Sequence, residues 1–139
     1  HLLLAARHRA GDLAAPLHRS ATVDVVVAVA PYVPTAARRL LPIDVQRHEP
    51  ALALDGGDDG LETIRRIVVD AARLLRVGGR LLLELGGEQD VALAPDLVRH
   101  GFAAIETWHD HDGDLRGLAA TRTARSARIG AELDLLNLG

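Results

Sequence analysis

The chain has 139 residues, enough for one compact domain with a hydrophobic core and too few for two domains of ordinary size. Nearly half of the residues are apolar, but there is only one each of Phe, Trp and Tyr, so we expect an aliphatic core. The net charge of -3, with arginines scattered among acids, excludes the basic stripe that binds nucleic acid, and the lack of cysteine excludes disulfides and thiolate metal sites.

The apolar runs are no longer than strands, so the sequence predicts no membrane-spanning helix. The apolar run in the amino-terminal segment HLLLAARHRAG is too short for a secretion signal, and the segment has no cleavage site. We interpret it as part of a domain cut from something longer, and the cysteine-free composition is compatible with a cytoplasmic protein.

The first clear element is a strand over Val23 to Ala30, VDVVVAVA, which is apolar almost without alternation and rich in valine. This pattern is typical of a parallel strand covered on both faces, so we expect it in the middle of a sheet. Pro31 ends the strand because proline cannot donate to the ladder. Later prolines leave room for one short helix over Thr35 to Leu41, followed by a loop.

A long helix is predicted from Gly60 to about Val77, because capping-box spacing between Asp59 and Glu62 precedes an apolar face. The pattern RLLLEL, Arg80 to Leu85, then predicts a second buried strand. A strand, a helix and a strand in this order indicate a right-handed crossover between two adjacent parallel central strands.

A shorter helix is expected over Val91 to His100, with an ambiguous first turn because of Pro95. The segments GFAAIETW and GLAATRTA predict two strands joined by a hairpin at HDHDGDLR. The fold class is therefore α/β, with a sheet that closes on an antiparallel carboxyl-terminal hairpin. We place the domain at residues 1–125 and assign no role to the tail, residues 126–139.

The stretch APYVP follows the strand end at which open α/β sheets bind ligands. Pro31 fixes the backbone and holds the preceding carbonyl outward, and Tyr32 can form the wall of a small pocket. A plain turn with an aromatic plug is the alternative reading of these two residues.

Five segments follow one another as they do in one enzyme family. They are GDLAAPL, VDVVVAVAPYVP, RHEPALALDGGDDGLETIRRI, LLRVGGRLLLELGGEQ and GFAAIETWHDHDGDLR, from about Gly11 to Arg122. In this order they resemble the carboxyl-terminal half of the catalytic domain of the protein-(glutamine-N5) methyltransferases, the HemK family. The resemblance implies a Rossmann-like class I methyltransferase sheet, S-adenosylmethionine as methyl donor, and a glutamine amide of a peptide-chain release factor as acceptor.

The resemblance also implies roles for individual residues. The family signature Asn-Pro-Pro-Tyr falls on Val29, Ala30, Pro31 and Tyr32, so the last two match as catalytic-site residues and Val29 lacks the side-chain acceptor of Asn. The family's segment near the adenine matches Asp12 and Leu13, which would accept from the adenine amino group and cover its ring; an ordinary loop is the alternative.

The family's glycine-rich turn and the acid that holds the ribose would precede His1. We therefore expect this chain alone to bind S-adenosylmethionine weakly or not at all. Two alternatives stay open: a divergent methyltransferase with another acceptor, and a non-catalytic binding or structural relic of the fold.

Two further polar features have a structural interpretation. The run HDHDGD, His109 to Asp114, is expected to be a solvated hairpin loop, with no metal, because Gly113 is misplaced for a calcium loop. Glu84 lies in an apolar strand and should be near the strand end or bonded to a partner. The family has a Glu there too, which favours a structural or pocket-edge role.

Overall fold

The computed structural model describes residues 11–17, 22–30, 58 and 60–124. Its elements run in the order β1 (Val23–Ala28), α3 (Glu62–Leu74), β2 (Leu75–Glu84), α4 (Gln89–Arg99), β3 (Phe102–His109) and β4 (Leu115–Arg122). The expected helix at 35–41 and the tail at 126–139 lie outside the described residues. No helix within the described ranges is long and apolar enough to cross a membrane.

The strands form one mixed sheet in the order β1-β2-β4-β3. β1 and β2 are adjacent and parallel, with Val27 opposite Leu82, and α3 connects them. β3 and β4 form the expected antiparallel hairpin, and β4 also pairs antiparallel with β2. The α/β class, the parallel pair and the hairpin are confirmed.

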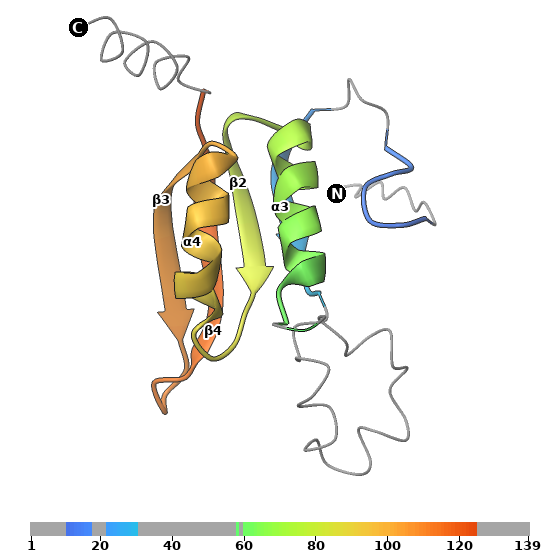
Figure 1. The fold of residues 1–139 in the computed structure, drawn as a ribbon. Helices are drawn as coiled ribbons and strands as arrows, with labels where there is room; N and C mark the ends of the chain where they lie inside the picture. The colour runs from blue at the N-terminus through green and yellow to red at the C-terminus, as the bar shows by residue number, and fades with distance from the viewer. Residues whose placement is uncertain (1–10, 18–21, 31–57, 59, 125–139) are drawn as a thin grey trace, which may run out of the picture.

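Helices α3 and α4 lie on the same side of the sheet (Figure 1). The apolar face of α3 is buried as the periodicity predicts, and alternate residues of β2 point toward the helices. The core between the two layers includes Ile64, Val68, Ala71, Leu81, Leu83, Leu85, Leu93, Leu97 and Leu118.

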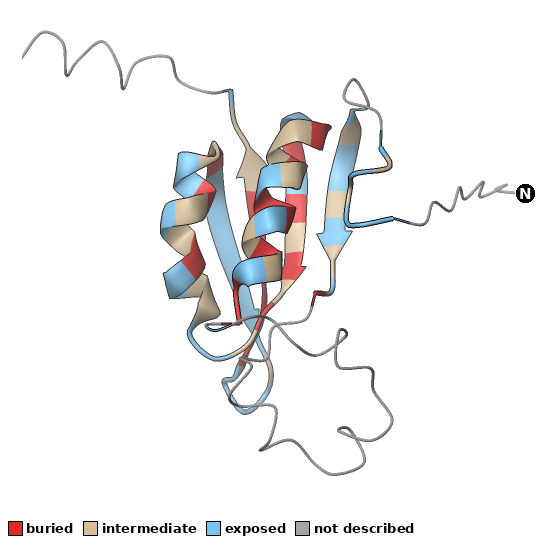
Figure 2. Cartoon of the chain, turned by 45° about the vertical axis from the view of Figure 1, so that its right-hand side comes forward, coloured by how far each residue is buried: buried red, intermediate tan, exposed pale blue. Residues whose placement is uncertain are grey.

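The expectation that Val23–Ala30 lies in mid-sheet and is covered on both faces is wrong for the described part of the molecule. β1 is the edge strand of the four, and Val25, Val27 and Val29 are 52%, 68% and 74% exposed. Figure 2 shows this exposed strand beside the buried positions of β2. The physical reason is that both described helices pack on one face, so the other face of β1 has no cover among these residues.

The helix boundaries also differ from the predicted ones. α3 starts at Glu62, with Leu61 as an N-cap that makes no side-chain bond, and ends at Leu74 instead of near Val77. The chain becomes extended at Leu75 because that residue already pairs with Val23 of β1. α4 starts two residues earlier than predicted and contains Pro95.

Candidate functional site

The carboxyl ends of β1 and β2 lie side by side at one end of the sheet, where α/β sheets commonly bind ligands. β1 ends at Ala28, and Val29 and Ala30 continue the chain beyond it. β2 ends at Glu84, after which the amide of Leu85 donates to the carbonyl of Arg116 at 3.2 Å. This bond holds the end of β2 against the start of β4.

A cavity of about 300 Å³ opens at these strand ends, and we call it the strand-end cavity. Residues paired across neighbouring strands point to the same face, and Val27 pairs with Leu82 while Glu84 pairs with Gly117. The cavity therefore lies on the face opposite α3 and α4. Its lining includes Val27, Val29, Leu82, Glu84, Trp108 and Arg116.

Trp108 reaches the strand-end cavity across Gly117, its partner on β4. A Cβ atom on Gly117 would lie 2.0 Å from Cζ2 of Trp108 and 2.6 Å from the carbonyl oxygen of Leu83. No side chain fits between the indole and the backbone of β2, so glycine at this position lets the ring lie flat toward the middle of the sheet. Sequence reasoning missed Trp108; the available signal was that it is the only tryptophan among the 139 residues.

Glu84 is half-buried as the last residue of β2, which confirms the expectation that it stands near a strand end. No group in the described part of the chain bonds to its carboxylate. Arg116, on the same cavity wall, is held by Asp110, whose Oδ2 accepts from its Nε at 2.8 Å. The lining of the cavity thus includes the carboxylate of Glu84 and the guanidinium of Arg116, and Asp110, which is not part of the lining, fixes the position of the guanidinium.

The predicted catalytic-site residues Pro31 and Tyr32 lie outside the described residues, so their roles stay predictions. Val29 and Ala30 are described: the Val29 side chain is largely exposed, and Ala30 is buried at the edge of the core. Val29 offers only apolar surface at the end of β1, as its side-chain chemistry requires.

The segment with Asp12 and Leu13 is docked on the outer side of α3 by polar contacts. The Asp12 carboxylate accepts from Nη2 of Arg66 at 2.5 Å, and the amide of Ala14 donates to Oδ2 of Asp70 at 3.2 Å. Leu13 has a φ of 49°, a left-handed value that bends the chain at this residue. These contacts place Leu13 between α3 and the edge strand.

Leu13 lines a second cavity, of about 550 Å³, which we call the edge cavity. It lies between the 11–17 segment, the open edge of β1 and helix α3, and it also touches Val29 and Ala30. The structure therefore brings the Leu13 position and the Val29–Ala30 position together around one cavity, although they are far apart in the sequence. Asp12 does not line this cavity, and its side chain is 70% exposed.

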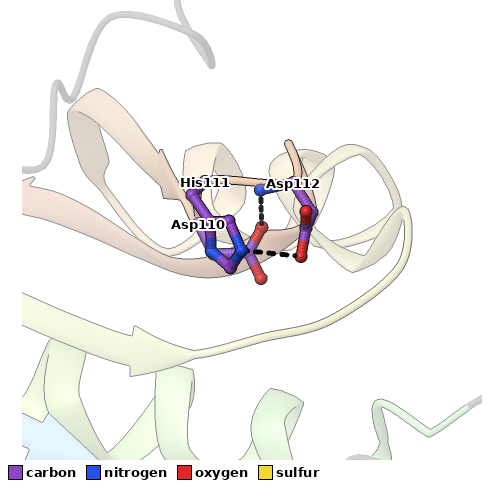
Figure 3. Close-up of side chains that lie close together, drawn as sticks. All are labelled: Asp110, His111 and Asp112. Atoms are coloured by element: carbon purple, nitrogen blue, oxygen red, sulfur yellow. Dashed lines mark hydrogen bonds and ion pairs between the residues drawn. The ribbon is translucent and has the colours of Figure 1, made fainter.

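The hairpin loop between β3 and β4 holds the other polar cluster. Possible ligand atoms of Asp110, His111 and Asp112 lie within 4.8 Å of one another, and Nε2 of His111 is 3.2 Å from Oδ2 of Asp112 (Figure 3). The Asp110 carboxylate is already engaged, because Oδ1 accepts from the amides of Asp112 and Asp114 at 3.0 Å. These amide bonds and the Arg116 guanidinium hold the pKa of Asp110 below its ordinary value, the Asp114 bond contributing most. The carboxylate shapes the turn.

Comparison with known proteins agrees with the fold and with the sequence resemblance. No family model matches the chain. Among curated proteins, it is 54% identical over 89 residues to the release factor glutamine methyltransferase of Moorella thermoacetica, covering 64% of this chain and 30% of that protein. It is 40% identical over 125 residues to the protein of the same name from Mycolicibacterium smegmatis, covering 89% of this chain and 43% of that one. The chain thus spans less than half the length of these relatives.

Among solved structures, the chain is similar to a chain of the E. cuniculi Mtq2–Trm112 complex, described as responsible for methylation of the translation termination factor eRF1. The TM-score is 0.53 at 23% identity, over 81% of this chain and 59% of that one, which shows the class I methyltransferase fold. From the relatives and this shared fold, we conclude that the chain belongs to the HemK family of protein-(glutamine-N5) methyltransferases.

Proposed function

We propose that the full-length protein transfers a methyl group from S-adenosylmethionine to the side-chain amide of a glutamine in a peptide-chain release factor. The observation that carries this proposal is the 54% identity over 89 residues to a release factor glutamine methyltransferase. The strand ends of β1 and β2 support it, because they provide a cavity on each side of the Val29–Ala30 segment.

Of the two residues that we propose for the adenine end of the donor, only Leu13 lines the edge cavity. Leu13 offers an apolar surface in the edge cavity that could cover a flat ring. Asp12 has two carboxylate oxygens and could accept from an amino group while it remains paired with Arg66. S-adenosylmethionine would supply an electrophilic methyl group; the protein's part is to bind and orient donor and acceptor.

The acceptor nitrogen must be held in line because an amide lone pair is delocalised and reacts poorly. Positioning and fixed hydrogen-bond acceptors supply this help. In the proposed site the carbonyl of Ala30 accepts one N–H of the glutamine, Pro31 keeps that carbonyl pointing outward, and Tyr32 forms one wall.

The proposal is tested by incubating the full-length protein with S-adenosylmethionine and a release-factor peptide, and by locating added methyl groups by mass spectrometry. We expect one methyl group on the glutamine and none on a control peptide with Ala at that position. Methylation at another residue would favour the divergent-acceptor alternative. Calorimetric titration that detects no S-adenosylmethionine binding by the full-length protein would favour a non-catalytic relic.

Val29 is the observation that favours a second candidate, a methyltransferase with another acceptor. If a glutamine is the acceptor, Val29→Asn in the full-length protein should add a hydrogen-bond acceptor and raise the rate of glutamine methylation, by up to about 10²-fold. The comparison of initial rates on the release-factor peptide checks this. Equal rates for the two proteins would mean that the acceptor side chain needs no hydrogen-bond acceptor at position 29, and the peptide assay described above would then decide between glutamine and another acceptor.

A further inference from the structure

Glu84 has the position of a ligand-binding group whose partner comes from outside the described residues. It stands at the carboxyl end of β2, half-buried in the strand-end cavity, and no described group bonds to it. Leaving a partly buried carboxylate without a hydrogen-bond partner is costly, so such a group usually has a structural or ligand partner. The cavity beside it is open to a ligand.

The lining indicates which chemistry the strand-end cavity would select. Val27, Val29 and Leu82 form an apolar floor, and the indole of Trp108 forms a flat wall that Gly117 allows to lie close to β2. Such surfaces suit the aliphatic stem and the planar head of a side chain.

The charged groups of the lining favour a neutral head over a cation. Glu84 is the carboxylate, and Arg116 carries the opposite charge on the same wall, held in place by Asp110. A carboxylate can only accept hydrogen bonds when ionised, so the ligand must donate. A planar, uncharged group with N–H donors on an aliphatic stem is a primary carboxamide.

We propose that Glu84 accepts an N–H of the acceptor glutamine amide and positions that side chain in the strand-end cavity, against Trp108. This proposal rests on the proposed function and adds a recognition residue to it. Glu84 accepts a hydrogen bond and takes no proton from the amide. Its role is in binding the substrate, and it is not a general base.

The test uses Glu84→Met in the full-length protein, because methionine keeps the length of the side chain and removes the acceptor. The matched control is Glu88→Met, which removes an equal charge from an exposed position outside the cavity lining. Affinities are measured by calorimetry for three release-factor peptides that differ only in having Gln, Leu or Lys at the acceptor position, and Tm is measured for each variant.

We expect Glu84→Met to weaken binding of the Gln peptide about 10- to 100-fold, the usual effect of a hydrogen bond to a charged group. Binding of the Leu peptide, Tm and all values for Glu88→Met should not change. A purely structural role would lower Tm and weaken the Gln and Leu peptides together. That result overturns the proposal, and so does an unchanged affinity for the Gln peptide. Tighter binding of the Lys peptide than of the Gln peptide by the unaltered protein also overturns it.

Failure of the proposed function gives a different pattern. If the unaltered protein neither binds nor methylates the Gln peptide, the probe becomes N-acetylglutamine methylamide, and its binding is followed by the indole N–H resonance of Trp108, which is assigned by its loss in a Trp108→Phe variant. A shift that Glu84→Met abolishes upholds the carboxamide site without the release-factor substrate. The absence of a shift in the unaltered protein overturns the site as well.

Discussion

At the scale of single residues, Asp110 shows how one side chain can set the shape of a loop. It accepts from two backbone amides and from Arg116, so three parts of the hairpin converge on one carboxylate. Because Arg116 also lines the strand-end cavity, Asp110 fixes the position of one residue of the candidate site.

Asp110→Asn should destabilise the protein in a pH-dependent way. The pKa of Asp110 is lowered from its ordinary 3.8, so its stabilising effect is fully present above that value and is lost as the pH falls through the lower folded pKa. We expect Tm of the variant to be lower at pH 7, by on the order of a few degrees, and the difference to shrink below about pH 4. Thermal unfolding from pH 7 to pH 2.5, followed by circular dichroism, measures it.

The matched control is Asp112→Asn, because Asp112 is exposed and its carboxylate contacts only the exposed His111 among the described residues. Its Tm should stay close to that of the unaltered protein at every pH. A Tm difference for Asp110→Asn that is the same at pH 7 and pH 2.5 would show that the carboxylate charge has no part in the effect.

At the scale of secondary-structure elements, α4 carries an avoidable cost. Pro95 lies inside the helix Gln89–Arg99 and is exposed, and proline cannot donate to the carbonyl four residues earlier, that of Val91. Pro95→Ala should restore that bond. The expected gain in the free energy of unfolding is about 1–3 kcal/mol, the helix penalty of proline less its effect on the unfolded chain.

Urea unfolding measures this gain, and Val91→Ala serves as the control because Val91 is 71% exposed in the same helix. The control changes side-chain size without adding a backbone donor, so it should alter stability by less than about 0.5 kcal/mol. A Pro95→Ala variant no more stable than the unaltered protein would mean that the proline is accommodated here at no cost.

The elements themselves could be predicted where the periodicity is strong. The crossover between β1 and β2 follows from an apolar strand, an amphipathic helix and a second apolar strand, and the structure confirms the parallel pair. The end of α3 could not be predicted from Gly78 and the nearby arginines, because Leu75 pairs with Val23 before the helix can continue. Tertiary pairing decided that boundary.

The candidate site was only partly predictable for a similar reason. The strand end at Val29 could be predicted from the sequence. That Trp108 and Glu84 line the same cavity could not, because it depends on the position of β4 between β2 and β3. A signal for that insertion exists in the sequence: Leu118, Ala119 and Ala120 are consecutive apolar residues, as in an interior strand, and the structure buries all three. The prediction of the hairpin did not take this apolar run into account.

At the scale of the whole molecule, α3 and α4 cover one face of the sheet, and the other face, which we call the open face, has no cover among the described residues. Val25, Val27 and Val29 form an exposed row on the open face of the edge strand, and Trp108 of β3 lies on the same face of the sheet. Exposed apolar rows and an unpaired strand edge promote association, because both can be covered by a second molecule. The 139-residue chain should therefore self-associate as its concentration rises.

Val27→Lys should reduce this association about tenfold or more, because a second molecule could cover the row only by burying a charged side chain. Val27 is 68% exposed, so its replacement should leave the fold intact, and sedimentation velocity over a range of concentrations measures the effect. Val98→Lys is the control: Val98 is similarly exposed but lies on α4, away from the open face. If both variants associate as the unaltered chain does, the valine row is not the surface through which the molecules meet. If only Val27→Lys becomes monomeric, the open face of β1 is the surface through which two molecules associate.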